Sequence, residues 1–136
     1  MINNKMVGLA LFCLVSGNAQ AGGASVRFSN LVNGQKVKSP VEVCMKAQGV
    51  VIEAVQNGVR EGHGHLHILV DVVLPSDLDA PLPSDKPGQF VHLGDGSNCR
   101  TLELAPGRHQ LRALLTNGAH VPGKPVVTHL IKITVE

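Results

Sequence analysis

Histidine is the residue type whose number and spacing in this sequence point most directly to chemistry. Seven histidines occur in 136 residues, and three of them, His63, His65 and His67, fall in one Gly-His-Gly-His-Leu-His run. A neutral imidazole binds zinc or copper through one ring nitrogen. Side chains two residues apart lie on the same face of a strand, where two donors can share one ion. We therefore predict that His65 and His67 form the central pair of a metal site.

The pattern of apolar residues assigns these histidines to one face of a strand. The alternate positions are all apolar: Leu66, Ile68 and Val70. If those side chains form the core, the histidines lie on the opposite face together with Asp71, and they are not core residues. The same test gives the reverse result for His109 and His129. Both are in phase with apolar neighbours, so we predict that they lie at the edge of the core and do not bind metal.

Two further histidines are placed to complete the ligand set. His92 closes one predicted strand and His120 lies in a turn after another, at the end of the molecule where the histidine pair is expected. A third donor from either residue, with water or His63 in the remaining position, would complete the coordination. Met45 is the one methionine beyond the predicted export signal and is in phase with the core, so the thioether donors that suit Cu(I) are missing. The donor set favours copper as Cu(II), or zinc as Zn(II).

Two alternatives use the same residues without a metal ion. The histidine-rich face could be a polar surface whose rings bond to backbone or water, or one whose charge responds to pH. The loops at this end could instead dock a protein or another component of the cell envelope. Metal handling or sequestration is the leading hypothesis, and a non-metal interaction module is its alternative.

The apolar residues are distributed in short runs rich in Val, Ile, Leu and Thr, separated by turn-forming Gly, Pro and Asn. The runs predict strands at residues 25–28, 40–46, 65–71, 90–93, 99–104, 109–116 and 127–135. No stretch has a convincing helical repeat, so we predict an all-β fold, an immunoglobulin-like β-sandwich of about seven strands.

The proline-rich segment 74–88 separates two of these strands. Its prolines exclude a central strand, and we predict an ordered surface crossing between the two sheets. The segment carries Asp77, Asp79 and Asp85, which could bind calcium, although a solvated acidic loop is the favoured interpretation.

The first 21 residues have the composition of a cleavable export signal. Lys5 precedes an apolar run too short to anchor in a bilayer, and Ala19-Gln20-Ala21 has the small-x-small pattern that a signal peptidase cuts. We predict a signal peptide over residues 1–21 and a single domain over residues 22–136. That domain would be periplasmic or secreted, with no membrane span in the mature protein.

Two cysteines, Cys44 and Cys99, remain after the predicted signal is removed. Both are out of phase with the apolar positions of their strands, so both should point away from the core. In an immunoglobulin-type order these strands are neighbours in one sheet, and exported proteins meet an oxidising compartment. We predict a Cys44–Cys99 disulfide on the outer face, which would stabilise the domain by on the order of 4 kcal/mol.

Charge and motifs argue against several functional classes. The 12 Lys and Arg residues nearly balance the 10 Asp and Glu residues, unlike the basic composition of domains that bind nucleic acid. The sequence has no Gly-x-Ser-x-Gly, His-Glu-x-x-His or phosphate-loop motif, so no enzymatic activity is predicted. The run at residues 63–67 is similar to the His-x-His strand of copper-zinc superoxide dismutases. Segment 72–89 lacks the further histidines of that family's metal loop, so a dismutase-like enzyme is the least favoured hypothesis.

A longer set of motifs resembles one bacterial exported family. The Gly-His-Gly-His-Leu-His-Ile-Leu-Val-Asp run at residues 62–71 is followed by Leu82-Pro83, Val91-His92-Leu93-Gly94, Pro106-Gly107-Arg108-His109 and His120-Val121-Pro122. In this order, over nearly all the mature chain, they resemble the family named domain of unknown function 4399. The resemblance implies a histidine pattern at His65, His67, His92, His109 and His120, and it implies no established activity.

The sequence departs from that family's pattern at a few positions. Phe90 stands where members often carry a histidine, and Gly123-Lys124 replaces a His-Asp pair. Fewer donors imply a weaker or narrower site in this protein. Cys44 and Cys99 are not part of the pattern, so the predicted disulfide would be an addition of this protein.

Overall fold

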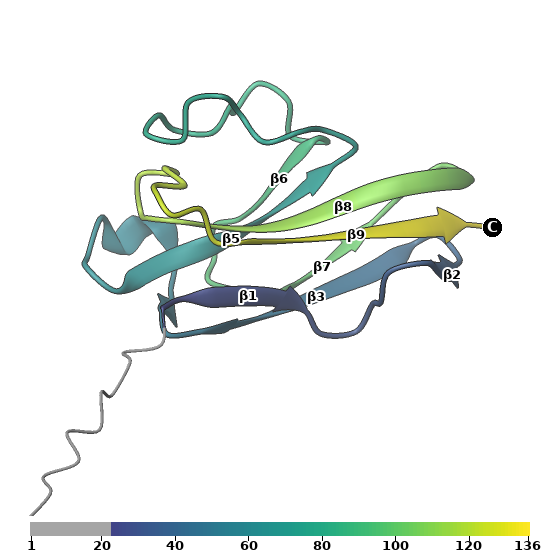
Figure 1. Ribbon diagram of the computed structural model, residues 1–136, viewed down its shortest axis with the longest axis horizontal. Helices are drawn as coiled ribbons and strands as arrows, with labels where there is room; N and C mark the ends of the chain where they lie inside the picture. The colour runs from purple at the N-terminus through teal and green to yellow at the C-terminus, as the bar shows by residue number, and fades with distance from the viewer. Residues whose placement is uncertain (1–22) are drawn as a thin grey trace, which may run out of the picture.

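Two β-sheets lie face to face in the computed structural model, which describes residues 23–136 (Figure 1). The elements are β1 (Ser25–Phe28), β2 (Gln35–Val37), β3 (Val41–Gln48), β4 (Val51–Ile52), the 3-10 helix η1 (Val55–Asn57), β5 (His63–Val70), β6 (Phe90–Leu93), β7 (Cys99–Leu102), β8 (Gly107–Thr116) and β9 (Thr128–Val135). The all-β sandwich prediction is confirmed. The predicted signal peptide and its cleavage site lie outside the described residues.

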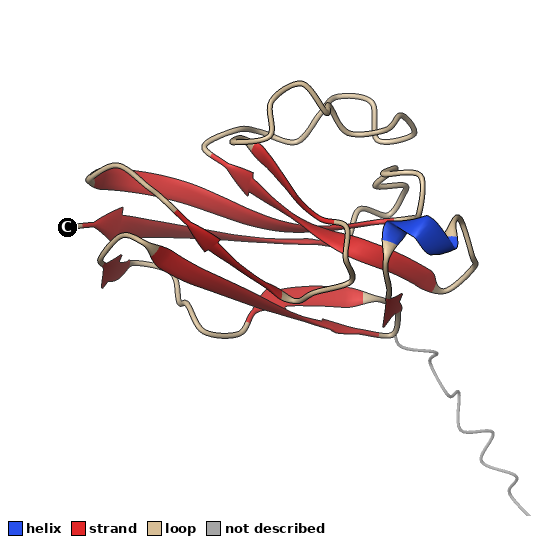
Figure 2. Ribbon diagram, turned by 180° about the vertical axis from the view of Figure 1, so that it is seen from behind, coloured by secondary structure: helices blue, strands red, loops and turns tan. Residues whose placement is uncertain are grey.

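The larger sheet carries most of the molecule. Its strand order is β2-β9-β8-β5-β4, with β6 also paired to β5, and the smaller sheet has the order β1-β3-β7. Strands β5, β8 and β9 pair antiparallel, whereas the short edge strands β2 and β4 run parallel to their neighbours. The short helix η1 lies at the end of the sandwich where β5 begins (Figure 2). No helix among residues 23–136 is long and apolar enough to cross a membrane.

The core forms where alternate side chains of the two sheets meet. Strand β3 contributes Val41, Val43 and Met45, β5 contributes Leu66 and Ile68, and β9 contributes Ile131, Ile133 and Val135. Burying a side chain of this size stabilises the fold by roughly 1.5–3 kcal/mol. The phases predicted for these strands from the sequence are therefore confirmed.

Strands β2 and β4 have no counterpart among the predicted strands. β2 has three residues and β4 has two, so neither is long enough to show an alternating apolar pattern. Each exists because a neighbouring long strand supplies hydrogen-bond partners, β9 for β2 and β5 for β4. Such pairing is decided by tertiary structure, and local sequence does not reveal it.

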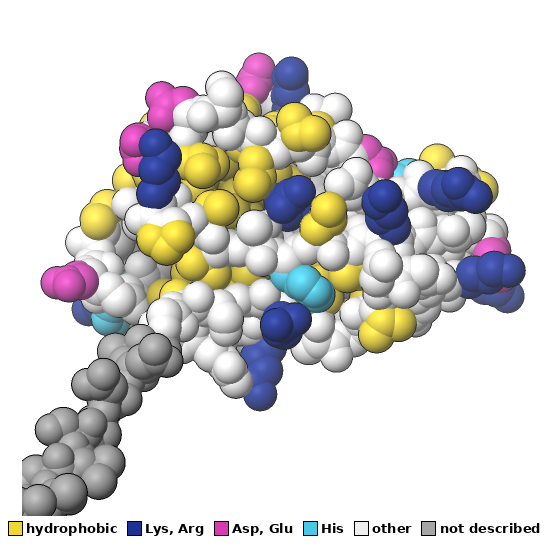
Figure 3. Space-filling view, viewed as in Figure 1, with side chains coloured by type: hydrophobic (Ala, Val, Ile, Leu, Met, Phe, Trp, Pro, Cys, Tyr) yellow, Lys and Arg dark blue, Asp and Glu magenta, His cyan; other side chains and the backbone are white. Residues whose placement is uncertain are grey.

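Strand β5 is buried on both faces, because the long connection from β5 to β6 folds over its outer face. Leu69 packs there with Leu82 of this connection and Leu114 of β8. Figure 3 shows apolar side chains gathered on the face below the long loop, surrounded by charged side chains of both signs. The predicted crossing between sheets is wrong, because β5 and β6 are antiparallel neighbours within one sheet.

Two of the three acidic residues of this connection, Asp77 and Asp79, have local partners. Asp77 accepts a hydrogen bond from the backbone N–H of Asp79 at 3.0 Å, and Asp79 pairs with Lys124 at 3.4 Å.

The disulfide links the central strand of the smaller sheet, β3, to the edge strand β7. Cys44 of β3 and Cys99 of β7 are opposite each other in the strand register, and their sulfurs are bonded. The predicted pairing is confirmed.

Candidate metal centre

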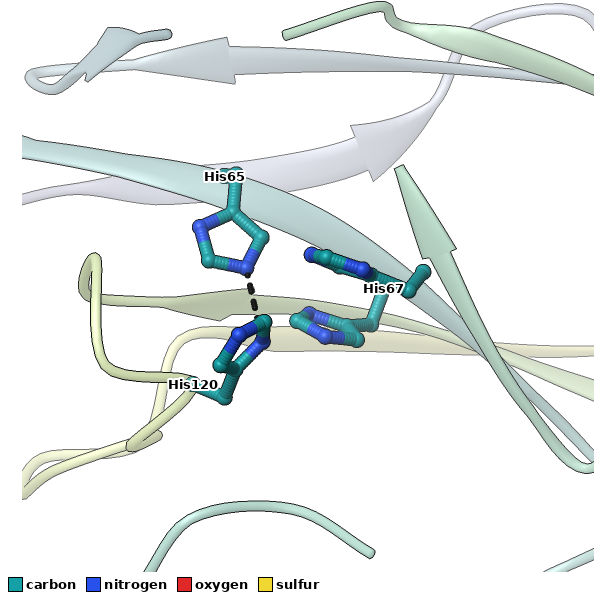
Figure 4. A group of neighbouring side chains, drawn as sticks. His65, His67 and His120 are labelled. Atoms are coloured by element: carbon teal, nitrogen blue, oxygen red, sulfur yellow. Dashed lines mark hydrogen bonds between the residues drawn. The ribbon is translucent and has the colours of Figure 1, made fainter. Parts of the chain in front are cut away.

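Four histidines from three separate segments converge over the outer face of the larger sheet. His65 and His67 come from β5, His92 from β6, and His120 from the loop that follows β8. Each offers a ring nitrogen, and these four atoms all lie within 4.8 Å of one another. Figure 4 shows the rings of His65, His67 and His120 pointing toward one another. This group could hold one metal ion.

Strand pairing fixes three of the four side chains. His67 lies directly opposite His92 in the β5–β6 register, and their rings stack with centroids 4.8 Å apart. His65, two residues before His67 on β5, lies opposite Thr116 of β8. Because β5 is hydrogen-bonded on both sides, these backbone positions cannot shift independently. The ligand set is therefore built on a rigid support.

His120 is held by the geometry of its loop. Its backbone is left-handed, with φ of 64°, a conformation that non-glycine residues adopt seldom and mostly at turns and functional sites. The side chain of Asn117 fixes the loop by accepting hydrogen bonds from the N–H groups of Ala119 and Val121, at 2.9 and 3.1 Å. The carbonyl of His120 also accepts a hydrogen bond from the N–H of Leu82 at 2.9 Å. These contacts aim the imidazole at the strand histidines.

Gly94 leaves room for the ring of His92. A Cβ atom at position 94 would overlap the imidazole of His92, so no larger residue fits there without moving the ring. The glycine was visible in the sequence as part of a turn, and its contact with the histidine is a result of the fold.

Burial distinguishes this group from a polar surface. His65 and His67 are 1% and 2% exposed, beneath the loops that cover the outer face. The sequence correctly predicts that they lie opposite Leu66 and Ile68. The interpretation of this face as a surface is wrong, because the connection from β5 to β6 covers it and makes a second apolar cluster there.

Burial favours the uncharged form of His65, His67 and His92. Desolvation and the neighbouring His92 and His120 lower the pKa of His65 to about 4, and desolvation with the other three rings lowers the pKa of His67 to about 2. The pKa of His92 is also lowered, by burial first and then by His120 and Arg100. A metal ion binds the neutral form of histidine, so these rings need not lose a proton at neutral pH.

Spacing and hydrogen bonding both fit an ion. Nε2 of His65 and Nδ1 of His120 lie 3.2 Å apart, within hydrogen-bond distance. Nitrogens bound tetrahedrally to zinc at about 2.0–2.1 Å would lie about 3.3–3.4 Å apart. Among residues 23–136, the buried Nδ1 of His65 and Nε2 of His92 have no hydrogen-bond partner. The hydroxyl of Thr116 lies 3.4 Å from Nε2 of His65 and 3.5 Å from Nδ1 of His67.

The remaining histidines named by the sequence lie elsewhere. His63, the predicted reserve ligand, is not part of the group, and its Nδ1 lies 3.1 Å from a carboxylate oxygen of Glu53 and 3.1 Å from Arg60. His109 is bonded to Asp71 and to the carbonyl of Ala105, both at 2.7 Å.

His129 accepts a hydrogen bond from the N–H of Phe28 at 3.1 Å and packs against that ring. The predicted core-edge positions of His109 and His129 are confirmed.

A family model described as "Domain of unknown function (DUF4399)" matches residues 43–136. The chain belongs to this family. No curated protein matches the chain. A solved structure similar to it is the X-ray structure of the endo-beta-1,4-mannanase from Thermotoga petrophila, at 16% identity and a TM-score of 0.49. The match covers 88% of this chain and 21% of that one, and it carries no functional argument.

Other residues of this DUF4399 domain, not predicted from the sequence, support the four histidines. Thr116, Asn117 and Gly94 contact or position them, and Arg100 lies in a cavity beside them. Asn117 begins an Asn-Gly turn, a visible signal for a turn but not for the placement of His120. Arg100 alternates with Cys99 on its strand, so the outward phase assigned to the cysteine also predicts an inward arginine.

Proposed function

We propose that this DUF4399 domain binds a divalent transition metal ion, copper or zinc, through His65, His67, His92 and His120, and handles or sequesters that ion. The observation that carries the proposal is the convergence of four imidazoles with their nitrogens within 4.8 Å of one another. Nε2 of His92 is buried and has no hydrogen-bond partner among the described residues. Leaving such a nitrogen without a partner costs about 1–3 kcal/mol, a cost that an ion bound to it would remove.

The donor chemistry supports the choice of metal. Imidazole nitrogen suits zinc and Cu(II), whereas calcium and magnesium take oxygen ligands. The group contains no methionine or cysteine, the soft donors that suit Cu(I).

Location and mode of action follow from the same features. The Cys44–Cys99 disulfide supports an oxidising compartment, and we propose the periplasm or the secreted fraction. We propose binding and not catalysis, because the sequence has no catalytic motif beside the four ligands.

Protein purified without a histidine tag provides the test. Elemental analysis should find one zinc or copper ion per chain after loading at pH 7.5. Ligand that binds the native state alone stabilises it by RT ln(1 + [L]/Kd), so metal at about 100 times Kd should add ~2.7 kcal/mol to the free energy of unfolding. A denaturant titration with and without metal measures this gain.

The matched variants are His120→Asn and His63→Ala. Asparagine tolerates the left-handed backbone at position 120 while removing the imidazole, so the apo fold should be preserved. Loss of a residue that only hydrogen-bonds to a metal ligand typically lowers metal affinity at least ~10-fold, and we expect loss of the ligand His120 to lower it by at least as much. His63→Ala should bind as tightly as wild type. If wild type binds neither metal, or His120→Asn binds as tightly, the metal proposal fails and docking of an envelope protein by these loops takes its place.

A further inference from the structure

A cavity of about 590 Å³ opens beside the four histidines. His67, His92 and His120 line it on one side, and Arg100 of β7 lines it as well. Its volume lies within the range of about 300–1,000 Å³ that is usual for small-molecule sites. An ion held by the histidines would therefore face a space large enough for a further ligand.

Arg100 brings unused hydrogen-bond donors to this cavity. It lies on the face of β7 that it shares with the buried Leu102, opposite the exposed Cys99. Within residues 23–136 its guanidinium makes one ion pair, with Asp95 at 3.8 Å, and no hydrogen bond. Asp95 is instead held by Ser97, whose N–H and hydroxyl donate to it at 3.1 and 2.6 Å. The planar guanidinium thus keeps donors free for an anion.

The positive charge of a metal ion bound by the four histidines also favours binding of an anion. Four neutral imidazoles do not offset the charge of a divalent ion, and Arg100 adds a further positive charge. No carboxylate belongs to the group of four ligands found among the described residues. The charge of an ion held by the buried histidines is costly unless it is paired. An anion drawn from solution would pair with the metal and with the guanidinium of Arg100, which is 39% exposed and has only the ion pair with Asp95 among the described residues.

Another part of the cavity lining is apolar. It includes Leu82 and Pro87 of the long connection and Phe90 of β6. Such a wall suits the hydrocarbon part of an organic ligand. A guanidinium matches the two oxygens of a carboxylate with two parallel hydrogen bonds, which favours a carboxylate over a halide or hydroxide.

We infer that the metal centre takes a small organic carboxylate as an additional ligand, with its carboxylate between the metal ion and Arg100 and its hydrocarbon part against Phe90 and Leu82. The inference rests on the proposed metal function. It extends that function by a class of ligand, because the domain would then bind a metal ion together with an organic carboxylate and not a metal ion alone.

The test begins with metal occupancy and continues with carboxylates. Protein loaded with Cu(II) is titrated with benzoate, acetate and benzamide, while the visible absorption and electron paramagnetic resonance spectra are recorded. Both carboxylates should change the spectra saturably, and benzamide should not. Benzoate should bind more tightly than acetate, because its ring can lie on the apolar wall. Equal affinities would overturn the assignment of the hydrocarbon part.

Variants at position 100 separate this inference from the metal proposal. Arg100→Gln should bind Cu(II) as wild type does and weaken benzoate binding about tenfold or more. Arg27→Gln, at an exposed arginine of β1 that does not line the cavity, should match wild type in both measurements. Arg100→Lys serves if the glutamine variant does not fold, and it too should weaken benzoate binding, because it lacks the planar pair of donors.

The outcomes are distinct. Metal binding with no spectral response to carboxylates, or with an unchanged response in the Arg100 variants, overturns this inference and leaves the metal proposal intact. Failure of wild type to bind any metal overturns both.

Discussion

Strands β5 and β8 carry histidine sites at both ends, and the two sites hold their imidazoles in opposite states. At one end, His65 and His67 lie among other histidines, and burial lowers their pKa values. At the other end, hydrogen bonds to the carbonyl of Ala105 and to Asp71 raise the pKa of His109. Both partners of His109 are acceptors, so both ring nitrogens must carry protons to satisfy them. Burial favours the neutral form of the imidazole at His65 and His67, whereas hydrogen bonds to two acceptors favour its charged form at His109. The neighbours decide which form is favoured.

The largest expected effect is loss of apo stability in acid. The unfolded chain binds protons at His65 and His67 near pH 6.5, whereas the folded protein does so only near pH 4 and 2. Between these values the unfolded state binds more protons, so the free energy of unfolding falls as pH falls. From pH 7 to pH 5 we expect a loss of about 3–4 kcal/mol, measured by urea denaturation of metal-free protein.

The His67→Leu variant isolates the contribution of one of these two histidines to the pH dependence of stability. His67→Leu should remove roughly half of the pH dependence while filling the buried space. Equal stability of wild type at pH 7 and pH 5 would show that the cluster is not buried in the neutral form.

A smaller effect of opposite sign is expected at His109. Its folded pKa is raised, so its contribution is fully present below the unfolded pKa of about 6.5 and is lost as pH rises through the folded value. His109→Gln should destabilise the protein by about 1.5–3 kcal/mol at pH 6, where the hydrogen bonds are charged. The destabilisation should shrink above neutral pH.

Metal binding is the control for this variant. His109→Gln should show the same metal-induced gain as wild type, because His109 is not among the four grouped histidines. A lost gain would mean that the two ends are coupled through β8.

The smallest expected effect concerns the support of His120. Asn117→Ala removes the acceptor that holds the N–H groups of Ala119 and Val121, and should cost about 1 kcal/mol of stability. Metal affinity should also weaken, because His120 is no longer aimed at β5.

Asn33→Ala is the matched control. Asn33 accepts a hydrogen bond from the N–H of Lys132 at 2.8 Å, far along the chain from the histidines. It should lose comparable stability with unchanged metal affinity in calorimetric titration. If both variants bind metal like wild type, the loop conformation does not position His120.

How much of a residue's structural setting can be predicted from the sequence differs from residue to residue. Alternation places Leu66 and Ile68 in the core and directs Cys44 and Cys99 away from it, because side-chain direction in a strand is a local property. It gives the correct face for His65 and His67 but not their burial, which depends on a connection that reaches back over the same sheet. Alternation alone does not rank His63 against His92 as a ligand; the preference for His92 comes from the predicted positions of the strand ends and loops.

The sequence by itself determined an all-β chain, the inward and outward face of each long strand, and a supply of imidazole donors on one of those faces. Only the tertiary structure decided that His92 lies opposite His67, that His120 turns back onto them, and that Arg100 from the other sheet reaches the same cavity. The physical reason is the sequence distance over which each property is set. Strand periodicity repeats every two residues and can be read locally, whereas the convergence of residues 65, 92, 100 and 120 depends on strand pairing and loop closure over long separations.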